Sequence, residues 1–513
     1  MKVDDMGTYV DDTEELARGR MLEGLTPSQL SAARDLLAGE NVFLTGDAGT
    51  GKSFLLDRYI EYLDVVKKPK LVMAPTGVAA LNIRDGVTIH RAMGVPRGVL
   101  DAQALQRAPR VLKAADVVIV DEVSMVRIDL FEYVMKRVED VMTYSNKQVV
   151  LCGDFFQLPP VLTDKDRPTL MRLYPRCFKG YCFLSPMWED FGFRNHVLRE
   201  VVRQQDPGFQ HELDKARRGD SSCLGYFNAR SRSSWRYLPD DVPVLCTTNR
   251  MAETINAERV KALDARRHVY VGEAEGKIDK GDYAVEPRVE LCAGARVVAV
   301  ANDPDGHYVN GSLGRVVACR PDEVEVMFDE DPVTRVVEVR KWEIVTSRAV
   351  ETVRDGEKVL TVETETIGSY RQIPLKLAYA FTIHKSQGKT FEKLCVQTTT
   401  FEAGQLYVGL SRVKSAENLT VFPKIEPERL RANEDVLAFY ESLEAAAPRA
   451  NISPGTLEWL AGRVEQANKA KGGDPWSADE FLVAADDALR AVAEAAAVGE
   501  ASFNGHRIKL IEG

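Results

Sequence analysis

Residues 41–56 read Asn-Val-Phe-Leu-Thr-Gly-Asp-Ala-Gly-Thr-Gly-Lys-Ser-Phe-Leu-Leu, and this stretch decides the fold. Residues 46–53 match Gly-x-x-x-x-Gly-Lys-[Ser/Thr], a pattern that binds phosphate when a strand precedes it and a helix follows. The apolar run Asn41–Thr45 has the length of a strand, and apolar residues recur at helical spacing after the loop. We therefore predict a phosphate-binding loop; the simpler alternative is a Gly-rich strand-to-helix turn that holds no ligand.

The residue types in this loop suit a polyphosphate. Glycines let backbone N–H groups approach phosphate oxygens at the positive end of the helix. Lys52 would neutralise the charge of the outer phosphates, and Ser53 would bind Mg²⁺. The predicted nucleotide-binding residues of the loop are Gly46, Ala48, Gly49, Thr50, Gly51, Lys52 and Ser53.

Short β-branched runs alternate with helical stretches on both sides of the loop. This alternation predicts a parallel sheet covered by helices on both faces. A second set of runs begins at Val242–Cys246 and resumes at Leu375–Thr382, so we predict two α/β domains, the second of them interrupted. The other runs are Lys70–Ala74, Asp116–Val120, Gln148–Cys152, Lys393–Gln397 and Asn418–Phe422.

The interruption has a different pattern. From Cys292 to about residue 350, strand-like runs are separated by the turn dipeptides Asp305-Gly306 and Asn310-Gly311. This pattern predicts a small antiparallel barrel. The runs are Arg296–Val300, Gly314–Cys319, Val324–Phe328 and Arg335–Val339.

The two ends of the chain differ from its centre. Residues 1–24 predict a polar tail, and Thr26-Pro27-Ser28-Gln29 predicts a helix start with a capping box. Residues 431–513 are rich in Ala and Glu and predict helices, two of which would start at Ser453 and Ser477.

Composition excludes several classes of protein. The 513 residues predict three or four domains, and no apolar run reaches the roughly 18 residues that a membrane span needs. Eight scattered cysteines without a CxxC pair predict reduced thiols, most of them in cores. The net charge of -10 argues against a non-specific nucleic-acid coat but leaves room for a local basic groove.

Two more acidic or amide-bearing segments follow predicted strands. Asp121 and Glu122 end the apolar run 117–120, where carboxylates of a parallel sheet face the ligand. Asp121 would hold the Mg²⁺ shell and Glu122 would polarise the attacking water. Gln157, in the segment 153–160, would sense the terminal phosphate, although a Pro-rich exit turn explains that segment equally well.

Together these residues resemble the petite-integration-frequency (PIF) helicases and their RecD-like and Dda relatives in superfamily 1B. The likeness spans about residues 25–423 and rests on motifs in a fixed order, which is more specific than any one motif. Besides the segments above, the motifs are Leu25–Gln29, Ala74–Ala80, Gly86–His90, Leu198–Phe209, Val309–Gly314, Ile383–Thr390 and Gln405–Arg412.

The resemblance implies two RecA-like domains with ATP in the cleft between them. Gln29 would contact adenine, although the same side chain could instead serve only the capping box. Arg203 and Arg412 would reach the terminal phosphate as arginine fingers, which stabilise transition-state charge. The alternative for both is a surface salt bridge. Gly388 would touch the nucleotide cleft from the second domain.

The resemblance also implies that single-stranded DNA crosses both domains. Hydroxyl, imidazole, ammonium and backbone N–H groups suit phosphate oxygens, whereas a single histidine more often has a structural role. The family moves 5′ to 3′, so we expect this direction, with forked or tailed duplex DNA as a further partner. The implied strand contacts are Thr76, Gly77, His90, His384 and Lys385.

The expected fold class is α/β, with two RecA-like domains, an inserted barrel and a helical C-terminal region. Residues 431–513 have no counterpart in the resemblance; a protein-binding module is the sharper hypothesis, and a packing lid or solvated tail the alternatives. The segment 91–115 is short and lacks an aromatic residue, which leaves the geometry of unwinding open. The expected ranges are 25–205 for domain 1A, 206–264 and 371–430 for domain 2A, and 265–370 for domain 2B.

The sequence therefore predicts an ATP- and Mg²⁺-dependent DNA helicase for replication, repair or recombination. We expect a monomer in a bacterial or phage-related cytoplasm. A superfamily 1 RNA helicase stays open as an alternative, because contacts to the 2′-hydroxyl decide that preference. A non-hydrolysing clamp is disfavoured by Lys52, Glu122 and Gln157, and a small-substrate kinase by the second α/β set.

Overall fold

The predicted parallel sheet around the phosphate loop is present in the computed structural model. The sheet has six strands in the order β5-β4-β6-β7-β3-β8, and all neighbours run parallel. The strands are β3 (Val42–Gly46), β4 (Lys70–Ala74), β5 (Val87–Thr88), β6 (Val117–Val120), β7 (Gln148–Cys152) and β8 (Arg194–Leu198). The structure describes residues 2–3, 9–10, 12–95, 98–100, 108–142, 147–201, 206–276, 283–329, 331–354, 357–446, 501–503 and 508–510.

Helices cover both faces of this sheet. On one face, α2 (Pro27–Ala38) and α3 (Lys52–Val65) bury apolar residues at helical spacing against β3 and β7. On the other face lie α7 (Ile128–Met142) and α9 (Pro186–Asp190). Burying one Leu or Ile side chain contributes about 1.5–3 kcal/mol, so these two cores fix the loop that joins β3 to α3. The shorter helices are α4 (Gly77–Leu81), α5 (Ile89–Met93), α6 (Arg110–Ala114) and α8 (Arg167–Leu173).

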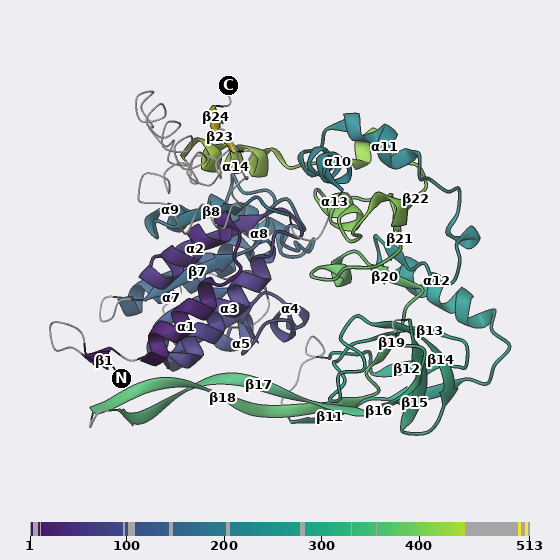
Figure 1. Cartoon of the computed structure of the whole chain (residues 1–513), viewed down its shortest axis with the longest axis horizontal. Coiled ribbons are helices and arrows are strands. Elements are labelled where there is room, and N and C mark those ends of the chain that lie inside the picture. The colour runs from purple at the N-terminus through teal and green to yellow at the C-terminus, as the bar shows by residue number, and fades with distance from the viewer. Residues whose placement is uncertain are drawn as a thin grey trace, which may run out of the picture.

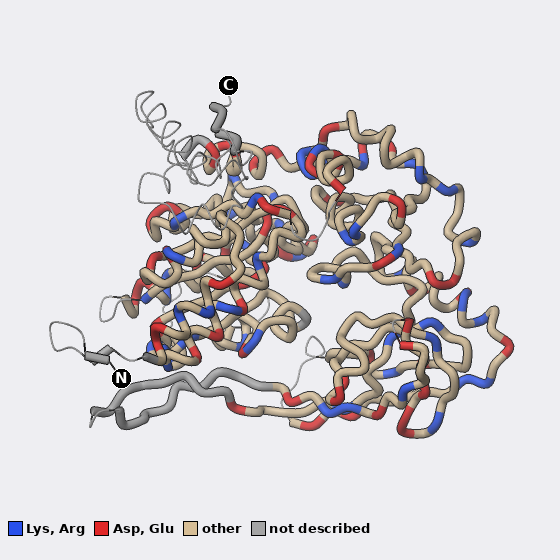
Figure 2. The backbone as a smooth tube through the Cα atoms, viewed as in Figure 1, with Lys and Arg blue, Asp and Glu red and all other residues tan. Residues whose placement is uncertain are grey.

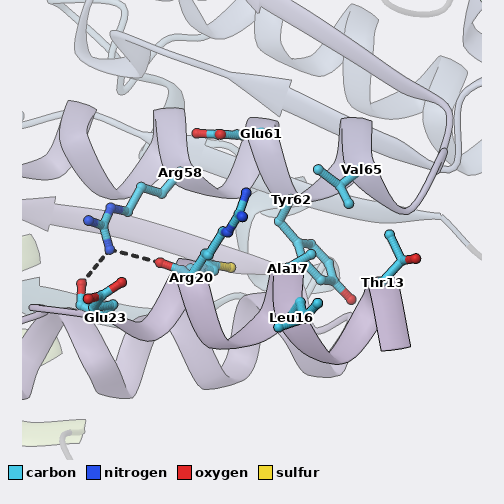
Figure 3. A pocket seen from close by; sticks show the side chains of 10 residues that line it. Thr13, Leu16, Ala17, Arg20, Glu23, Arg58, Glu61, Tyr62 and Val65 are labelled. Atoms are coloured by element: carbon cyan, nitrogen blue, oxygen red, sulfur yellow. Dashed lines mark hydrogen bonds between the residues drawn. The ribbon is translucent and has the colours of Figure 1, made fainter. Parts of the chain in front are cut away.

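The prediction of a polar tail is wrong for the segment that forms α1 (Asp12–Leu22). Ala17 and Met21, one helical turn apart, are buried, and α1 lies against α3. Figure 3 shows Arg58 of α3 donating hydrogen bonds to the carbonyls of Arg20 and Glu23. Two apolar residues of this polar helix therefore fall on the face that α3 covers, while Leu16 stays exposed.

A second parallel sheet has the order β20-β9-β21-β22, which confirms the second α/β domain. The predicted single strand Leu375–Thr382 is wrong, since it forms two strands in different sheets. Its first part, β19 (Leu375–Leu377), pairs with the barrel, and its second part, β20 (Ala380–Thr382), joins the parallel sheet. The other elements are β9 (Val244–Cys246), β21 (Leu394–Gln397), β22 (Leu419–Phe422), α10 (Pro207–Arg218), α11 (Leu224–Asn228), α12 (Asn249–Lys261) and α13 (Gln405–Leu410).

The inserted segment contains an antiparallel sheet in the order β16-β15-β14-β13-β19, close to the predicted runs. A long hairpin, β17 (Arg340–Arg354) and β18 (Glu357–Gln372), leaves it and runs beneath the first domain, where both strands lie against α6 (Figure 1). The remaining strands are β10 (His268–Val271), β11 (Glu273–Gly276), β12 (Arg288–Leu291), β13 (Arg296–Ala299), β14 (Leu313–Cys319), β15 (Glu323–Phe328) and β16 (Thr334–Glu338).

After the second domain the chain returns to the first. Helix α14 (Glu434–Ala446) lies over the first domain in Figure 1, and Val436, Tyr440 and Leu443 belong to the core of that domain. Two short strands, β23 (Ala501–Phe503) and β24 (Ile508–Leu510), pair antiparallel further on. The helix starts predicted at Ser453 and Ser477 lie outside the described residues.

Charge is mixed over the whole molecule. Figure 2 shows basic and acidic residues interspersed along both domains and the barrel. All eight cysteines are free thiols, and seven of them are buried. Within the described residues, no helix combines the length and apolar character of a membrane span.

Candidate functional site

The phosphate loop joins β3 to α3 in a conformation that requires glycine. Gly51 has a φ of +82°, in the left-handed region that other residues rarely adopt. A Cβ at this position would also collide with the amide of Gln29. The Gln29 amide donates to the carbonyl of Thr50 at 2.9 Å, while its oxygen accepts the N–H of Thr26 at 3.1 Å. Gln29 thus closes the capping box and contacts the loop at the same time.

Lys52 and Ser53 begin α3 directly after the loop. The Lys52 ammonium donates to the carbonyls of Gly46 at 2.8 Å and Asp47 at 3.0 Å. Its charge is therefore held over the loop, where an incoming anion would meet it. The side chain of Ser53 is exposed beside it.

Two carboxylates lie at the carboxyl end of β6. Burial raises the pKa of both Asp121 and Glu122, and each is close enough to Lys52 for the ammonium to counter the rise. For Glu122 the neighbouring Asp121 adds to the rise, and Arg412 opposes it. Glu122 also has a φ of +50°, a strained conformation of the kind that clusters at functional sites. The acids thus form one electrostatic unit with Lys52 and Arg412.

The segment after β7 contributes a buried amide and acid. Asp154 is fully buried and accepts the N–H of Phe156 at 3.1 Å. Gln157 donates its side-chain amide to Asp154 at 3.3 Å. Gly404, at the start of α13, packs against the carbonyls of Phe156 and Gln157. The two domains therefore touch at this segment.

Arg412 reaches this junction from the second domain. It is 2% exposed, and its Nε donates to the carbonyl of Val408 at 2.8 Å. Gly388, with a φ of +73°, follows the turn after β20. Arg203 lies outside the described residues.

The predicted strand contacts follow strand ends in both sheets. Thr76 caps α4 by accepting the Ala79 N–H at 3.2 Å, and Gly77 begins that helix. His90 lies in α5, directly after β5, the neighbour of β4. The three first-domain residues thus follow two adjacent parallel strands, whose carboxyl ends share one edge of the sheet.

In the second domain, His384 and Lys385 lie in a 3₁₀ turn after β20. Burial lowers the pKa of His384, so its ring is a neutral hydrogen-bonding group at neutral pH. The Lys385 ammonium pairs with Glu286 at 3.2 Å. Burial alone would raise the pKa of Glu286, but Lys376 and Lys385 together lower it.

A cavity of about 440 Å³ opens beside Lys385. It lies between α12, β12 and β20, and its basic lining residues are Arg267, Arg288, Lys376 and Lys385. Asn249, which follows β9, and Thr382, which ends β20, also line it. The carboxyl ends of these two neighbouring strands therefore lie at the same cavity. Sequence reasoning missed Asn249, although the turn Thr247-Thr248-Asn249 after a predicted strand was a usable signal.

Sequence reasoning also missed a buried group at the junction of the two domains. Arg217 of α10 contacts Asp154 at 3.1 Å and Asp47 at 3.0 Å. Tyr407 of α13 accepts the N–H of Ala48 at 3.0 Å, and Tyr440 of α14 shares a 2.5 Å hydrogen bond with Thr45. These contacts join residues at least 63 positions apart, and no motif marks them.

Comparisons with known proteins agree with this geometry. A model of the PIF1-like helicase family matches residues 28–218. The ATP-dependent DNA helicase Pif1 of Bdellovibrio bacteriovorus is 32% identical over 442 residues, which cover 82% of this chain and 92% of the relative. Human ATP-dependent DNA helicase PIF1 is 30% identical, with 84% of this chain and 68% of the relative covered.

Solved structures support the same family assignment. Unliganded Pif1 from Bacteroides sp matches with a TM-score of 0.69 at 30% identity, over 82% of this chain and 97% of that one. Bacteroides Pif1 structures in complex with ADP-AlF4 and bound to single-stranded DNA match with TM-scores of 0.68 and 0.59. The chain therefore belongs to the PIF1-like helicase family and is an ATP-dependent DNA helicase.

Proposed function

We propose that this helicase hydrolyses ATP at the junction of its two RecA-like domains and moves 5′ to 3′ along single-stranded DNA. The observation that carries the proposal is that Lys52 of the first domain and Arg412 of the second both act electrostatically on Glu122, whose pKa each of them lowers. A nucleotide between them would couple the distance between the domains to its own binding and hydrolysis.

The residues have distinct roles in this proposal. The loop from Gly46 to Gly51 would cradle the phosphates, and Lys52 would neutralise their charge. Glu122 would take the proton of the attacking water, for which its raised pKa suits it near neutral pH. Arg412 would stabilise charge on the terminal phosphate in the transition state, with Arg203 as the second candidate for this role.

Gln29 would contact adenine with its second amide N–H, because the first donates to the carbonyl of Thr50. Gln157, whose amide donates to Asp154, would contact the terminal phosphate. Its backbone packs against Gly404, so the presence or loss of that phosphate would be transmitted to the second domain. Gly388 is a further candidate for a nucleotide contact from that domain. The roles of Gln29 and Gly388 come from the family resemblance.

Mg²⁺ fits the donor set at the head of α3. The hydroxyl of Ser53 and the carboxylate of Asp121 supply the hard oxygen ligands that this ion prefers. When bound, Mg²⁺ would neutralise charge on the phosphates. The buried Asp121, whose pKa is raised by burial, would gain a counter-charge from the ion.

Single-stranded DNA would cross the carboxyl-end edges of both sheets. Thr76, Gly77 and His90 would contact phosphates on the first domain, and His384 and Lys385 on the second. A DNA phosphate would replace Glu286 as the partner of Lys385. Because the family comparisons include Pif1 bound to single-stranded DNA, DNA is the favoured polymer.

We propose the domain ranges 25–205, 206–264 with 371–430, and 265–370 for domains 1A, 2A and 2B, except that Leu375–Leu377 pairs with the barrel. A forked or tailed duplex would be the substrate for unwinding, and one chain would suffice for activity. A protein partner through residues 431–513 and a cytoplasmic setting stay predictions from sequence.

The test is the rate of ATP hydrolysis with single-stranded DNA, with single-stranded RNA and with neither. The proposal predicts strong stimulation by DNA and loss of all activity in Lys52→Ala, which should still melt as a folded protein. Stimulation by RNA to the same level would replace the DNA assignment, and near-normal turnover by Lys52→Ala would refute the phosphate site.

A further inference from the structure

Arg217 is a buried cation between the two RecA-like domains. It ends α10 of the second domain and is 4% exposed. Its guanidinium contacts two carboxylates of the first domain, those of Asp154 at 3.1 Å and Asp47 at 3.0 Å. Because an unpaired buried charge is strongly destabilising, these two acids fix where the guanidinium lies.

Two neighbouring aromatic rings lie beside the same guanidinium. It lies 4.0 Å from the ring centroid of Phe156 and 5.1 Å from that of Tyr440, which are favourable cation–π distances. The Tyr440 hydroxyl also donates to Asp154 at 3.3 Å. Arg217 is therefore preorganised, and the acid that it holds most securely is Asp154.

Asp47 is the unusual partner, because it is part of the phosphate loop. It follows Gly46, and its carbonyl accepts from Lys52 at 3.0 Å. Burial raises the pKa of Asp47, and Arg217 opposes the rise. A carboxylate here adds negative charge to a loop that binds a polyanion, and like charges repel each other.

We propose that Arg217 is a positioning residue for the nucleoside triphosphate: it neutralises Asp47 across the domain junction, so that this acid does not repel the incoming phosphates. The inference deepens the proposed function and rests on the loop being the ATP site. The second domain contacts the same loop at a neighbouring residue, since the hydroxyl of Tyr407 accepts the Ala48 N–H at 3.0 Å.

The experiment measures KM for ATP and kcat, with saturating single-stranded DNA, for wild type, Arg217→Gln, Asp47→Asn and the double variant. Arg217→Gln should raise KM by about tenfold, with a smaller effect on kcat. Asp47→Asn should then lower KM by about tenfold in the Arg217→Gln background, and by clearly less in the wild-type background. Arg218→Gln is the matched control, since Arg218 lies on the same helix and pairs with the exposed Asp214.

A purely structural role for Arg217 would not produce this rescue. If the two substitutions act additively on KM, the inference is overturned. If Arg217→Gln does not fold, Arg217→Lys replaces it, because an ammonium lacks the planar fork whose two terminal nitrogens meet Asp47 and Asp154 separately. Asp47→Asn should then lower KM in the Lys background, and no improvement there overturns the inference. A wild type that does not hydrolyse ATP would instead refute the proposed function.

Discussion

Replacing Glu122 with Gln should lower the rate of ATP hydrolysis and raise the stability of the fold. The amide keeps the shape of the side chain but can neither take a proton from water nor ionise. Loss of a positioned general base typically costs 10²–10⁴-fold in rate, so kcat should fall by about 100-fold or more, with KM for ATP changed only a few-fold. The change in kcat alone marks a group that acts in the transition state.

The same substitution should stabilise the fold above neutral pH. Burial, reinforced by Asp121, raises the pKa of Glu122 to about 7, from 4.5. Between these values the folded chain binds more protons than the unfolded chain, so the free energy of unfolding falls as pH rises. The full difference corresponds to about 3 kcal/mol. Because the side chain is partly accessible to solvent, we expect about 1–2 kcal/mol.

Two assays test this reasoning. Melting of wild type and Glu122→Gln at pH 5 and pH 8 should give only a small difference in midpoint at pH 5 and a variant more stable by a few degrees at pH 8. The wild-type kcat/KM should rise with pH through about 7. Glu61→Gln, an exposed substitution on α3, is the control. Loss of nucleotide binding in Glu122→Gln, or a flat pH profile in wild type, would refute the role of Glu122 as base.

Three further predictions concern other parts of the site. Tyr440→Phe should lower the free energy of unfolding by about 1–3 kcal/mol, because the buried partners of its hydroxyl, Asp154 among them, lose a hydrogen bond; an unchanged melting curve would contradict this. Glu286→Gln should tighten binding to oligothymidine by up to about fivefold, since the exposed pair with Lys385 is worth at most about 1 kcal/mol, and weaker binding in a titration would remove Lys385 from the DNA path. Arg412→Ala should reduce kcat more than ATP affinity; if only KM rises in steady-state assays, the arginine is not a finger.

The sequence allowed the prediction of elements whose cause is local. β4 (Lys70–Ala74) and β7 (Gln148–Cys152) match their predicted ranges because each is a short, buried, mainly apolar run between helices. The phosphate loop was predictable because phosphate binding itself requires its glycines and Lys52, whichever domain surrounds them. The prediction of one strand over Leu375–Thr382 failed because this apolar run contributes strands to two sheets, and nothing in the local sequence marks the bend between them.

The long-range contacts of the site could not be predicted. Arg217 looks like one of several basic residues at the end of an amphipathic helix, and Tyr440 like a core residue of a C-terminal helix. Tyr440 reaches the site because α14 packs on the first domain, although it follows the second domain in the chain. Hydrophobic pattern predicts that such a helix packs, but not on which domain.

The central claim is that ATP hydrolysis drives movement along a DNA strand. The most direct measurement is strand displacement from duplexes with a 5′ or a 3′ single-stranded tail, with and without ATP, by wild type and Lys52→Ala. The account predicts ATP-dependent unwinding of the 5′-tailed duplex by wild type, little on the 3′-tailed duplex, and none by Lys52→Ala. Displacement that proceeds without ATP, or at the wild-type rate in Lys52→Ala, would contradict it.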